Sequence, residues 1–189
     1  MSGREEIYYK KSIITFDIET TSYVEEVKLE NGKTKTMKHA FMYIGAIYNN
    51  GIISKYRKWE DFISYFDSLS SLCSKNERYI IWVHNLSFEF QFMKDWIKFS
   101  DVFARKSHNV IKCVYKKIEF RDTLALSNCK LEKLAINEKL PVQKAVGDLD
   151  YSLIRHQSSR LDSVEENYVD LDVIIVAEYI KKKVKEYFL

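Results

Sequence analysis

Residues 40–57 hold the feature that most constrains the fold, two strand-like stretches separated by a tight-turn signal. The first stretch, AFMYIGAIY (40–48), is apolar and rich in β-branched and aromatic residues, and IISKYR (52–57) follows after Asn49-Asn50-Gly51. An Asn-Gly pair between two such stretches is typical of a two-residue hairpin turn. A third stretch, IITFDIETTS (13–22), alternates apolar and polar residues. Short connections between the three strands predict antiparallel pairing.

Residues 23–39, between the strands expected at 13–22 and 40–48, are strongly charged and carry Asn31-Gly32 at their middle. We expect a polar hairpin or an extended loop here. The Asn31-Gly32 pair predicts a type I′ turn at its tip, because that turn needs left-handed backbone at both central residues.

The rest of the chain alternates between helical periodicity and buried-strand patterns. The expected helices cover residues 59–73, 88–99, 129–140 and 163–186, and the expected strands cover residues 78–85, 110–115 and 118–123. The strand at 78–85 is apolar enough to be buried on both faces and parallel to its neighbours. Pro141 is expected to end the third helix. This order predicts an α/β fold with a mixed central sheet and flanking helices.

The last helix has the clearest signals. Ser163-x-x-Glu166 matches a capping box at its start. The inward stripe that we expect consists of Val164, Tyr168, Leu171, Ile175 and Tyr179.

Composition limits the class of protein. A chain of 189 residues with 46% hydrophobic residues, one Pro and five Gly predicts a single domain over residues 1–189. No stretch reaches the roughly 18–20 apolar residues that cross a bilayer, so no membrane partner is expected. The three cysteines share no C-x-x-C spacing and are interpreted as reduced thiols in the cytosol. The net charge of +3 permits a nucleic-acid partner without requiring one.

Several acids occupy positions that the patterns place near the core. Asp17 and Glu19 share one strand face, Glu89 opens a helix on the same side as Met93 and Trp96, and Asp172 lies within an apolar stripe. Buried carboxylates must pair with cations, bind a metal or be protonated. Hard cations such as Mg²⁺ prefer oxygen ligands, so a metal site is one solution.

Each of these acids also has a purely structural interpretation. A D-x-E pair is common on strands, and Glu89 favours the positive end of a helix dipole. Tyr168-x-x-x-Asp172 is a frequent helical pairing, with Asp170 beside it expected to be solvated. His84 and Asn85 fit a loop and a helix cap. It is the joint occurrence of these residues, each at the end of a core element, that favours a site.

Three segments resemble the exonuclease motifs of family B DNA polymerases, most closely those of the protein-primed polymerases of small tailed phages. They are FDIETT (16–21), HNLSFEFQFM (84–93) and YVDLD (168–172), and the resemblance extends to GDLDY (147–151) and to residues 165–180. It implies an RNase H-like exonuclease fold and a two-metal 3′→5′ exonuclease site that uses Mg²⁺ or Mn²⁺. Such a site belongs to the tyrosine variant of the four-carboxylate class.

The resemblance also implies roles for individual residues. The metal ligands would be Asp17, Glu19, Glu89 and Asp172, with Tyr168 orienting the water or the scissile phosphate. The residues that would contact the substrate strand are Thr20, His84, Asn85, Phe88, Thr123, Leu124 and Lys144. Trp82 and Phe92 are either neighbours of the same groove or core residues, and the lysines of KKKVK (181–185) either touch phosphate or are solvated.

Two positions depart from the family pattern. Glu89 stands where the second motif commonly has Asp, which lengthens that ligand. Val146 stands where these polymerases place a catalytic lysine before the glycine of GDLDY, and Lys144 is the candidate substitute for it.

The resemblance therefore predicts the proofreading module of a phage DNA polymerase, acting on the 3′ end of single-stranded DNA in the cytoplasm of an infected host cell. A polymerase domain and a terminal protein are the expected protein partners. Two alternatives stay open. One is a stand-alone exoribonuclease of the same superfamily, and the other is a binding module with a degenerate site, against which the four acids and Tyr168 argue.

Overall fold

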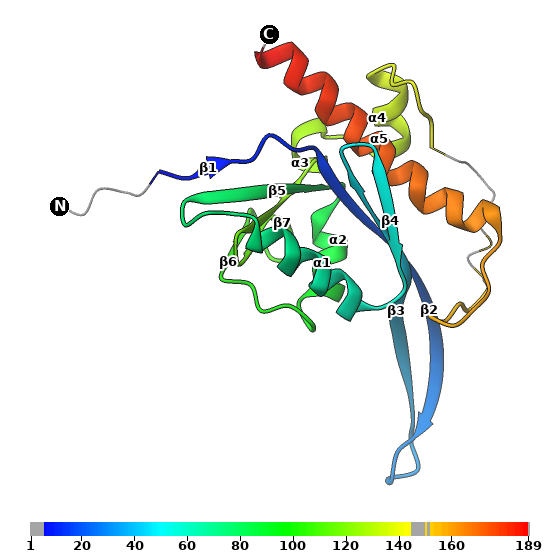
Figure 1. Cartoon of the computed structure of the whole chain (residues 1–189). Helices are drawn as coiled ribbons and strands as arrows, with labels where there is room; N and C mark the ends of the chain where they lie inside the picture. The colour runs from blue at the N-terminus through cyan, green and yellow to red at the C-terminus, as the bar shows by residue number, and fades with distance from the viewer. Residues whose placement is uncertain (1–5, 145–149, 151, 189) are drawn as a thin grey trace.

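An eight-stranded mixed sheet forms the centre of the protein, in a computed structural model that describes residues 6–144, 150 and 152–188 (Figure 1). The strand order is β4-β3-β2-β5-β8-β7-β6, and the short β1 pairs with β5 beside this path. The strands are β1 (Tyr8–Tyr9), β2 (Ile14–Lys28), β3 (Thr34–Asn49), β4 (Ile52–Tyr56), β5 (Glu77–Val83), β6 (Asp101–Ala104), β7 (Val110–Tyr115) and β8 (Ile118–Asp122). The helices are α1 (Trp59–Ser71), α2 (Leu86–Met93), α3 (Leu124–Ser127), α4 (Leu131–Asn137) and α5 (Ser163–Phe188).

The pairing confirms the predicted mixed α/β architecture. Strands β2, β3 and β4 are antiparallel, whereas β5 runs parallel to both β2 and β8. The turn between β3 and β4 has left-handed backbone at Asn50 (φ 48°) and Gly51 (φ 102°), as a type I′ turn requires. Strands β1 and β6 and helix α3 were not predicted, because two to four residues are too short to show a period.

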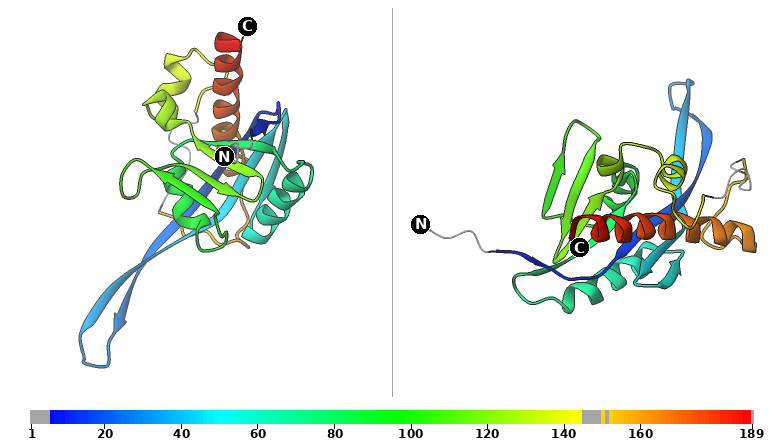
Figure 2. Two further views of the ribbon diagram at one scale, coloured as in Figure 1. Left: turned by 90° about the vertical axis from the view of Figure 1, so that its left-hand side faces the viewer. Right: turned by 90° about the horizontal axis from the view of Figure 1, so that it is seen from above.

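Helices cover both faces of the sheet (Figure 2). On one face, Ile14 and Phe16 of β2 belong to a core cluster that also contains Phe62 and Phe66 of α1. On the other face, α5 packs over β2 and β3, and the Thr15 hydroxyl donates a 2.7 Å hydrogen bond to the carbonyl of residue 173. Alternate residues of β2 therefore face different helices, as the period of two predicts.

Beyond the body of the sheet, β2 and β3 continue together as a two-stranded ribbon that projects from the molecule (Figure 1). Of the two forms expected for residues 23–39, a hairpin or an extended loop, the structure has the hairpin, and its strands are direct extensions of the core strands. The predicted type I′ turn is wrong: Gly32 has left-handed backbone (φ 77°) and Asn31 does not. The backbone N–H of Leu29 donates to the carbonyl of Lys33, which leaves a three-residue connection. A connection of this length favours a type I turn followed by a left-handed glycine.

Helix α2 ends at Met93, so the predicted helix over 88–99 is too long. After Met93 the chain turns to bury Ile97 and to place Phe99 against Phe90, with ring centroids 5.2 Å apart. Trp96 consequently lies outside the helix and is 50% exposed, and the expectation that it shares the side of Glu89 is wrong.

The capping box of α5 lies one residue earlier than predicted. The N–H of Glu165 donates to Asp162 Oδ1 (2.8 Å), and the N–H of Asp162 donates to Glu165 Oε2 (2.9 Å). Glu166 instead forms an ion pair with Lys55 at 3.1 Å. Both acids stand three residues after a possible cap, so the sequence pattern fits either pair.

The predicted inward stripe of α5 is confirmed at Tyr168, Ile175 and Tyr179, which are buried, and Leu171 is half-buried. It is wrong at Val164, which is 46% exposed. Complete burial on α5 starts only at Tyr168.

The three cysteines, Cys73, Cys113 and Cys129, are all free thiols. Helix α4 ends at Asn137, before Pro141, and Lys139 adopts left-handed backbone (φ 50°). Among the described residues, no helix combines the length and the apolar character needed to cross a bilayer.

Candidate functional site

An acidic cluster lies where β2 meets α5. Alternation along β2 directs Asp17 and Glu19 to the face that α5 covers, and α5 supplies Asp172. One carboxylate oxygen from each of these three residues lies within 4.8 Å of the others. The register of β2 against β3 shifts directly after Glu19, since Glu19 stands opposite Ile44 whereas Thr20 stands opposite Met42. Irregularities of this kind re-aim side chains beside functional sites.

Glu89 of α2 is the fourth acid near this cluster. It is 2% exposed, and its charge acts on Asp17 strongly enough to raise the pKa of that carboxyl. Glu89 Oε2 and Asp172 Oδ1 are both buried, and neither finds a hydrogen-bond partner among the described residues. Buried oxygens without donors suit a hard cation, so the donor set fits a divalent metal such as Mg²⁺ or Mn²⁺.

The electrostatics of the cluster support this interpretation. Burial and the neighbouring acids raise the pKa of Asp17 and of Glu89 well above their usual range. Burial and the charge of Asp172 raise the pKa of Glu19 to about 7, and burial also raises the pKa of Asp172. Like charges held together in a desolvated site resist ionisation unless a cation compensates them.

Lys144 is the one predicted substrate-contact residue that reaches the acids directly. Its ammonium group contacts the Asp172 carboxylate and lies 4.9 Å from the centre of the Tyr168 ring. Burial lowers the pKa of Lys144, but the charges of Asp172, Asp17 and Glu19 outweigh this effect and raise it. The neighbouring Val146 and most of GDLDY lie outside the described residues.

Four other predicted contact residues border this region. Asn85 precedes α2 with left-handed backbone (φ 69°) and is exposed, and Phe88 of the same helix is 41% exposed. His84 is half-buried, with Nδ1 3.0 Å from the Thr123 hydroxyl, and Thr20 follows the register shift in β2.

Thr123 does not lie at the surface, so the predicted contact between its side chain and a substrate strand does not fit the structure. The side chain is fully buried, and its hydroxyl donates to the carbonyl of Val83 while it holds the His84 ring. Leu124, the other half of the predicted pair, is half-buried at the start of α3.

Two structurally important residues were missed by sequence reasoning. Asp122 is buried, and its carboxylate accepts hydrogen bonds from four backbone N–H groups, those of Asn85, Leu86, Leu124 and Ala125. It thereby fixes the starts of α2 and α3. Arg155 is buried against Glu165 and Tyr43, and its charge partly offsets the rise in the pKa of Glu19. No local sequence pattern marks either role.

Several charged residues outside the cluster form ion pairs with each other. Asp170, expected to be solvated, forms a 3.1 Å ion pair with Lys55 because α5 brings it over β4. In the KKKVK segment, Lys182 and Lys183 both bind Glu138, at 2.8 and 3.0 Å. These ion pairs favour a structural role for the segment.

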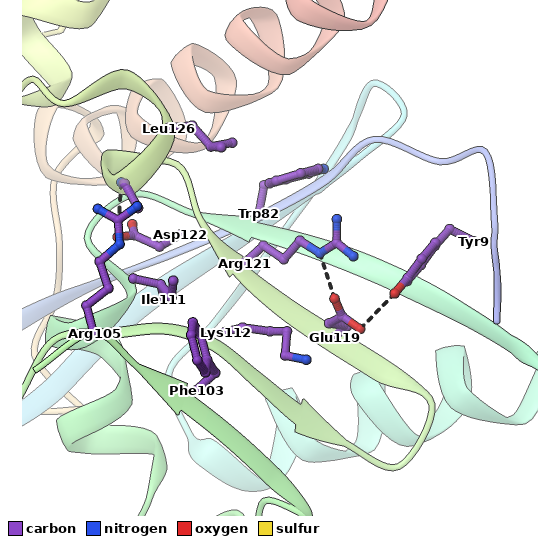
Figure 3. Close-up of a pocket in the computed structure, with 11 residues that line it drawn as sticks. Tyr9, Trp82, Phe103, Arg105, Ile111, Lys112, Glu119, Arg121, Asp122 and Leu126 are labelled. Atoms are coloured by element: carbon purple, nitrogen blue, oxygen red, sulfur yellow. Dashed lines mark hydrogen bonds and ion pairs between the residues drawn. The ribbon is translucent and has the colours of Figure 1, made fainter. Parts of the chain in front are cut away.

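A separate cavity of about 520 Å³ opens on the sheet face at β5, β8, β7 and β6 (Figure 3). Trp82, Arg121, Lys112 and Phe103 stand side by side across these four strands. Arg121 lies 4.8 Å from the Tyr9 ring and forms an ion pair with Glu119. None of the four clustered acids lines this cavity. Trp82 also packs against the α4–α5 core cluster, which favours its core interpretation.

Comparison with solved structures identifies similar folds. Phi29 DNA polymerase complexed with primer-template DNA and incoming nucleotides matches with a TM-score of 0.70 at 17% sequence identity, covering 94% of this chain and 31% of that chain. Phi29 DNA polymerase complexed with single-stranded DNA matches with a TM-score of 0.63 at 16% identity, covering 90% and 32%. This chain thus spans about a third of the polymerase. No protein-family model matches, and no curated protein matches. The likeness supports the predicted RNase H-like fold.

Proposed function

We propose that this protein is a metal-dependent 3′→5′ exonuclease that removes nucleotides from single-stranded DNA, as the proofreading module of a DNA polymerase does. The observation that carries the proposal is the convergence of Asp17, Glu19 and Asp172 within 4.8 Å, with Glu89 beside them. The four acids come from three elements that are distant in sequence, and of these four only Asp172 forms an ion pair among the described residues, with Lys144.

The four acids would hold the metal. Two divalent cations, when bound, supply activation of a water molecule and stabilisation of the leaving 3′ oxygen. Tyr168 lies one helical turn before Asp172, and its hydroxyl would orient the water or the scissile phosphate. The ammonium group of Lys144, held beside Asp172, supplies positive charge for a phosphate. The exposed ring of Phe88 offers a surface on which a terminal base can stack.

The solved structures of similar fold agree with this proposal. They are complexes of a DNA polymerase with primer-template DNA and with single-stranded DNA. From this likeness we infer that DNA is the substrate of this chain and that a polymerase domain and a terminal protein are its partners.

Digestion of a single-stranded DNA oligonucleotide labelled at its 5′ end tests the proposal. We expect a ladder that shortens from the 3′ end with Mg²⁺ or Mn²⁺ and no shortening with EDTA. Asp17→Asn with Glu19→Gln should lower the rate at least about 10³-fold, because positioning and charge stabilisation supply most of the catalysis. The matched control is Asp170→Asn, which removes an acid of the same helix as Asp172 that is paired with Lys55; it should retain the activity.

An intact oligonucleotide after incubation with metal and wild-type protein would overturn the proposal. A matched RNA oligonucleotide in parallel tests the substrate class, since faster digestion of RNA would indicate an exoribonuclease. Binding of the oligonucleotide without any hydrolysis would indicate a binding module.

A further inference from the structure

Four aromatic rings line up at the root of the β2–β3 ribbon. The rings of Tyr23 and His39 stack with centroids 4.9 Å apart, and those of Phe41 and His156 stack at 5.3 Å. Tyr23 and Phe41 meet edge to face at 6.2 Å, which joins the two pairs into one row. The row crosses both ribbon strands and reaches the loop before α5. We call these four residues the ribbon-root rings.

Three of these rings border a hollow that is open to solvent. A cavity of about 680 Å³ is lined by Tyr23, Phe41, Lys58 and His156, together with Gln157 and Ser158. Lys58 is exposed, and no acidic side chain of the described residues pairs with it. The ribbon-root rings belong to none of the core clusters that the described residues form. The row is therefore not explained by core packing.

A second, smaller cavity adjoins this hollow and shares Phe41 and Gln157 with it. Phe92 and Trp96 are among its other lining residues. The Phe92 ring lies 5.2 Å from the ring of Phe88, which precedes Glu89 in α2. Phe41, Phe92 and Phe88 thus form a series of aromatic side chains between the ribbon root and α2, the helix that carries Glu89.

Flat rings interspersed with amides, hydroxyls and a lysine suit single-stranded nucleic acid, because any base can stack on a ring and the cation attracts phosphate. We propose that the ribbon root is an auxiliary subsite for single-stranded DNA. It would bind the nucleotides on the 5′ side of the terminal one, through stacking on the ribbon-root rings and contact with Lys58. This inference rests on the proposed exonuclease function, which fixes the position of the 3′ end.

Binding in EDTA tests the subsite without hydrolysis. Two fluorescent 12-nucleotide strands of equal charge are compared by anisotropy, one intact and one with abasic positions at nucleotides three to six from the 3′ end. Wild-type protein should bind the intact strand about tenfold more tightly, the effect of one lost base stack or more. Tyr23→Leu with His156→Ala should reduce this preference to less than twofold. Lys58→Gln should weaken binding of both strands and flatten the salt dependence.

The matched control is Tyr187→Leu with His108→Ala, which removes the same residue types from exposed positions at the end of α5 and in the β6–β7 turn. It should keep the tenfold preference, and circular dichroism should show that both double variants fold. An equal affinity of wild-type protein for the two strands would overturn the subsite, as would an unchanged preference in Tyr23→Leu with His156→Ala. If wild-type protein prefers the intact strand but shows no nuclease activity with metal, the proposed exonuclease function is overturned and the subsite is supported.

Discussion

Asp122 and Glu89 are both buried acids, and their surroundings separate a structural carboxylate from a candidate ligand. Four backbone N–H groups donate to Asp122, so its charge is fully used in fixing two helix starts. Glu89 keeps a buried oxygen with no donor among the described residues. Burial alone therefore does not mark a functional acid. What distinguishes Glu89 is an unsatisfied buried oxygen beside other buried acids.

His84 is a partly buried titratable residue, and its protonation makes the stability of the protein depend on pH. Burial and the charge of Lys144 lower the pKa of His84 to about 4. Between pH 4 and 6.5 the unfolded chain binds a proton at this residue and the folded chain does not. The contribution of His84 to the unfolding free energy therefore falls, by about 3 kcal/mol at most, as the pH falls through this window, and this contribution is constant above it.

Urea unfolding of the wild type and of His84→Gln at several pH values measures this effect. The difference in unfolding free energy between the two proteins should shift in favour of the variant as the pH falls from 6.5 to 4. Titration of the imidazole by NMR gives an independent check, and a midpoint above 6 would contradict the prediction.

The acids of the candidate site could be named from the sequence motifs and their order along the chain. The contacts that these acids make could not. Asp17 and Glu19 follow from strand alternation, and Asp172 from helical spacing. The contact between Lys144 and Asp172 joins positions that are 28 residues apart. Such a contact depends on how a loop returns to the sheet, which no local period reports. The complete burial of Thr123 depends in the same way on tertiary packing.

At the scale of the element, helix ends proved harder to predict than helix existence. All four expected helices exist, yet α2 stops early and the cap of α5 is shifted by one residue. Local spacing cannot decide whether the capping box consists of Asp162 and Glu165 or of Ser163 and Glu166. What decides is that Glu166 pairs with Lys55 of β4, a contact made across the fold.

Replacement of Asp162 by Ala tests the corrected cap. The variant loses the hydrogen bond to the N–H of Glu165, so the unfolding free energy should fall by about 1 kcal/mol. Ser163→Ala is the matched control and should stay within about 0.5 kcal/mol of wild type, because a surface change outside a cap has little effect. Thermal unfolding compares the two variants, and a larger loss in Ser163→Ala would restore the original assignment.

At the scale of the whole molecule, one close approach links the core to the acidic cluster. Strand β3 carries Gly45 where the sheet meets α1. A methyl group at this position would lie 2.8 Å from Phe62 Cζ and 2.9 Å from both the Asp17 carbonyl oxygen and Ile18 Cγ2. The packing of α1, β3 and β2 therefore depends on the absence of a side chain there.

We expect Gly45→Ala to lower the unfolding free energy by about 2–3 kcal/mol, as overpacking of a core does. Because one obstacle is the backbone of Asp17, the variant should also bind Mn²⁺ less tightly. Gly32→Ala is the control: its φ of 77° is strained for alanine, but nothing lies within 4 Å. It should cost about 1 kcal/mol or less. Chemical unfolding and a metal titration provide the two measurements, and equal losses in both variants would contradict the argument.

The overall architecture was predictable because strand and helix patterns alternate along the chain in an order that only a mixed sheet accommodates. The strand order was not, since the parallel pairing of β5 with β8 joins segments 39 residues apart, Tyr79 with Ile118 for example. Which distant strands pair depends on which apolar faces can be buried together in the folded core. No local sequence pattern reports this.

The two-residue period of the ribbon strands limits which insertions and deletions the ribbon can accept. Successive side chains of a strand point to opposite faces, so one extra residue in β2 and one in β3 would turn every side chain beyond them to the other side. Insertion or deletion of two residues in each strand leaves the orientation intact and changes the reach by about 6.8 Å. Relatives of this chain should therefore differ in ribbon length by multiples of four residues in all, while the root and the acids keep their places.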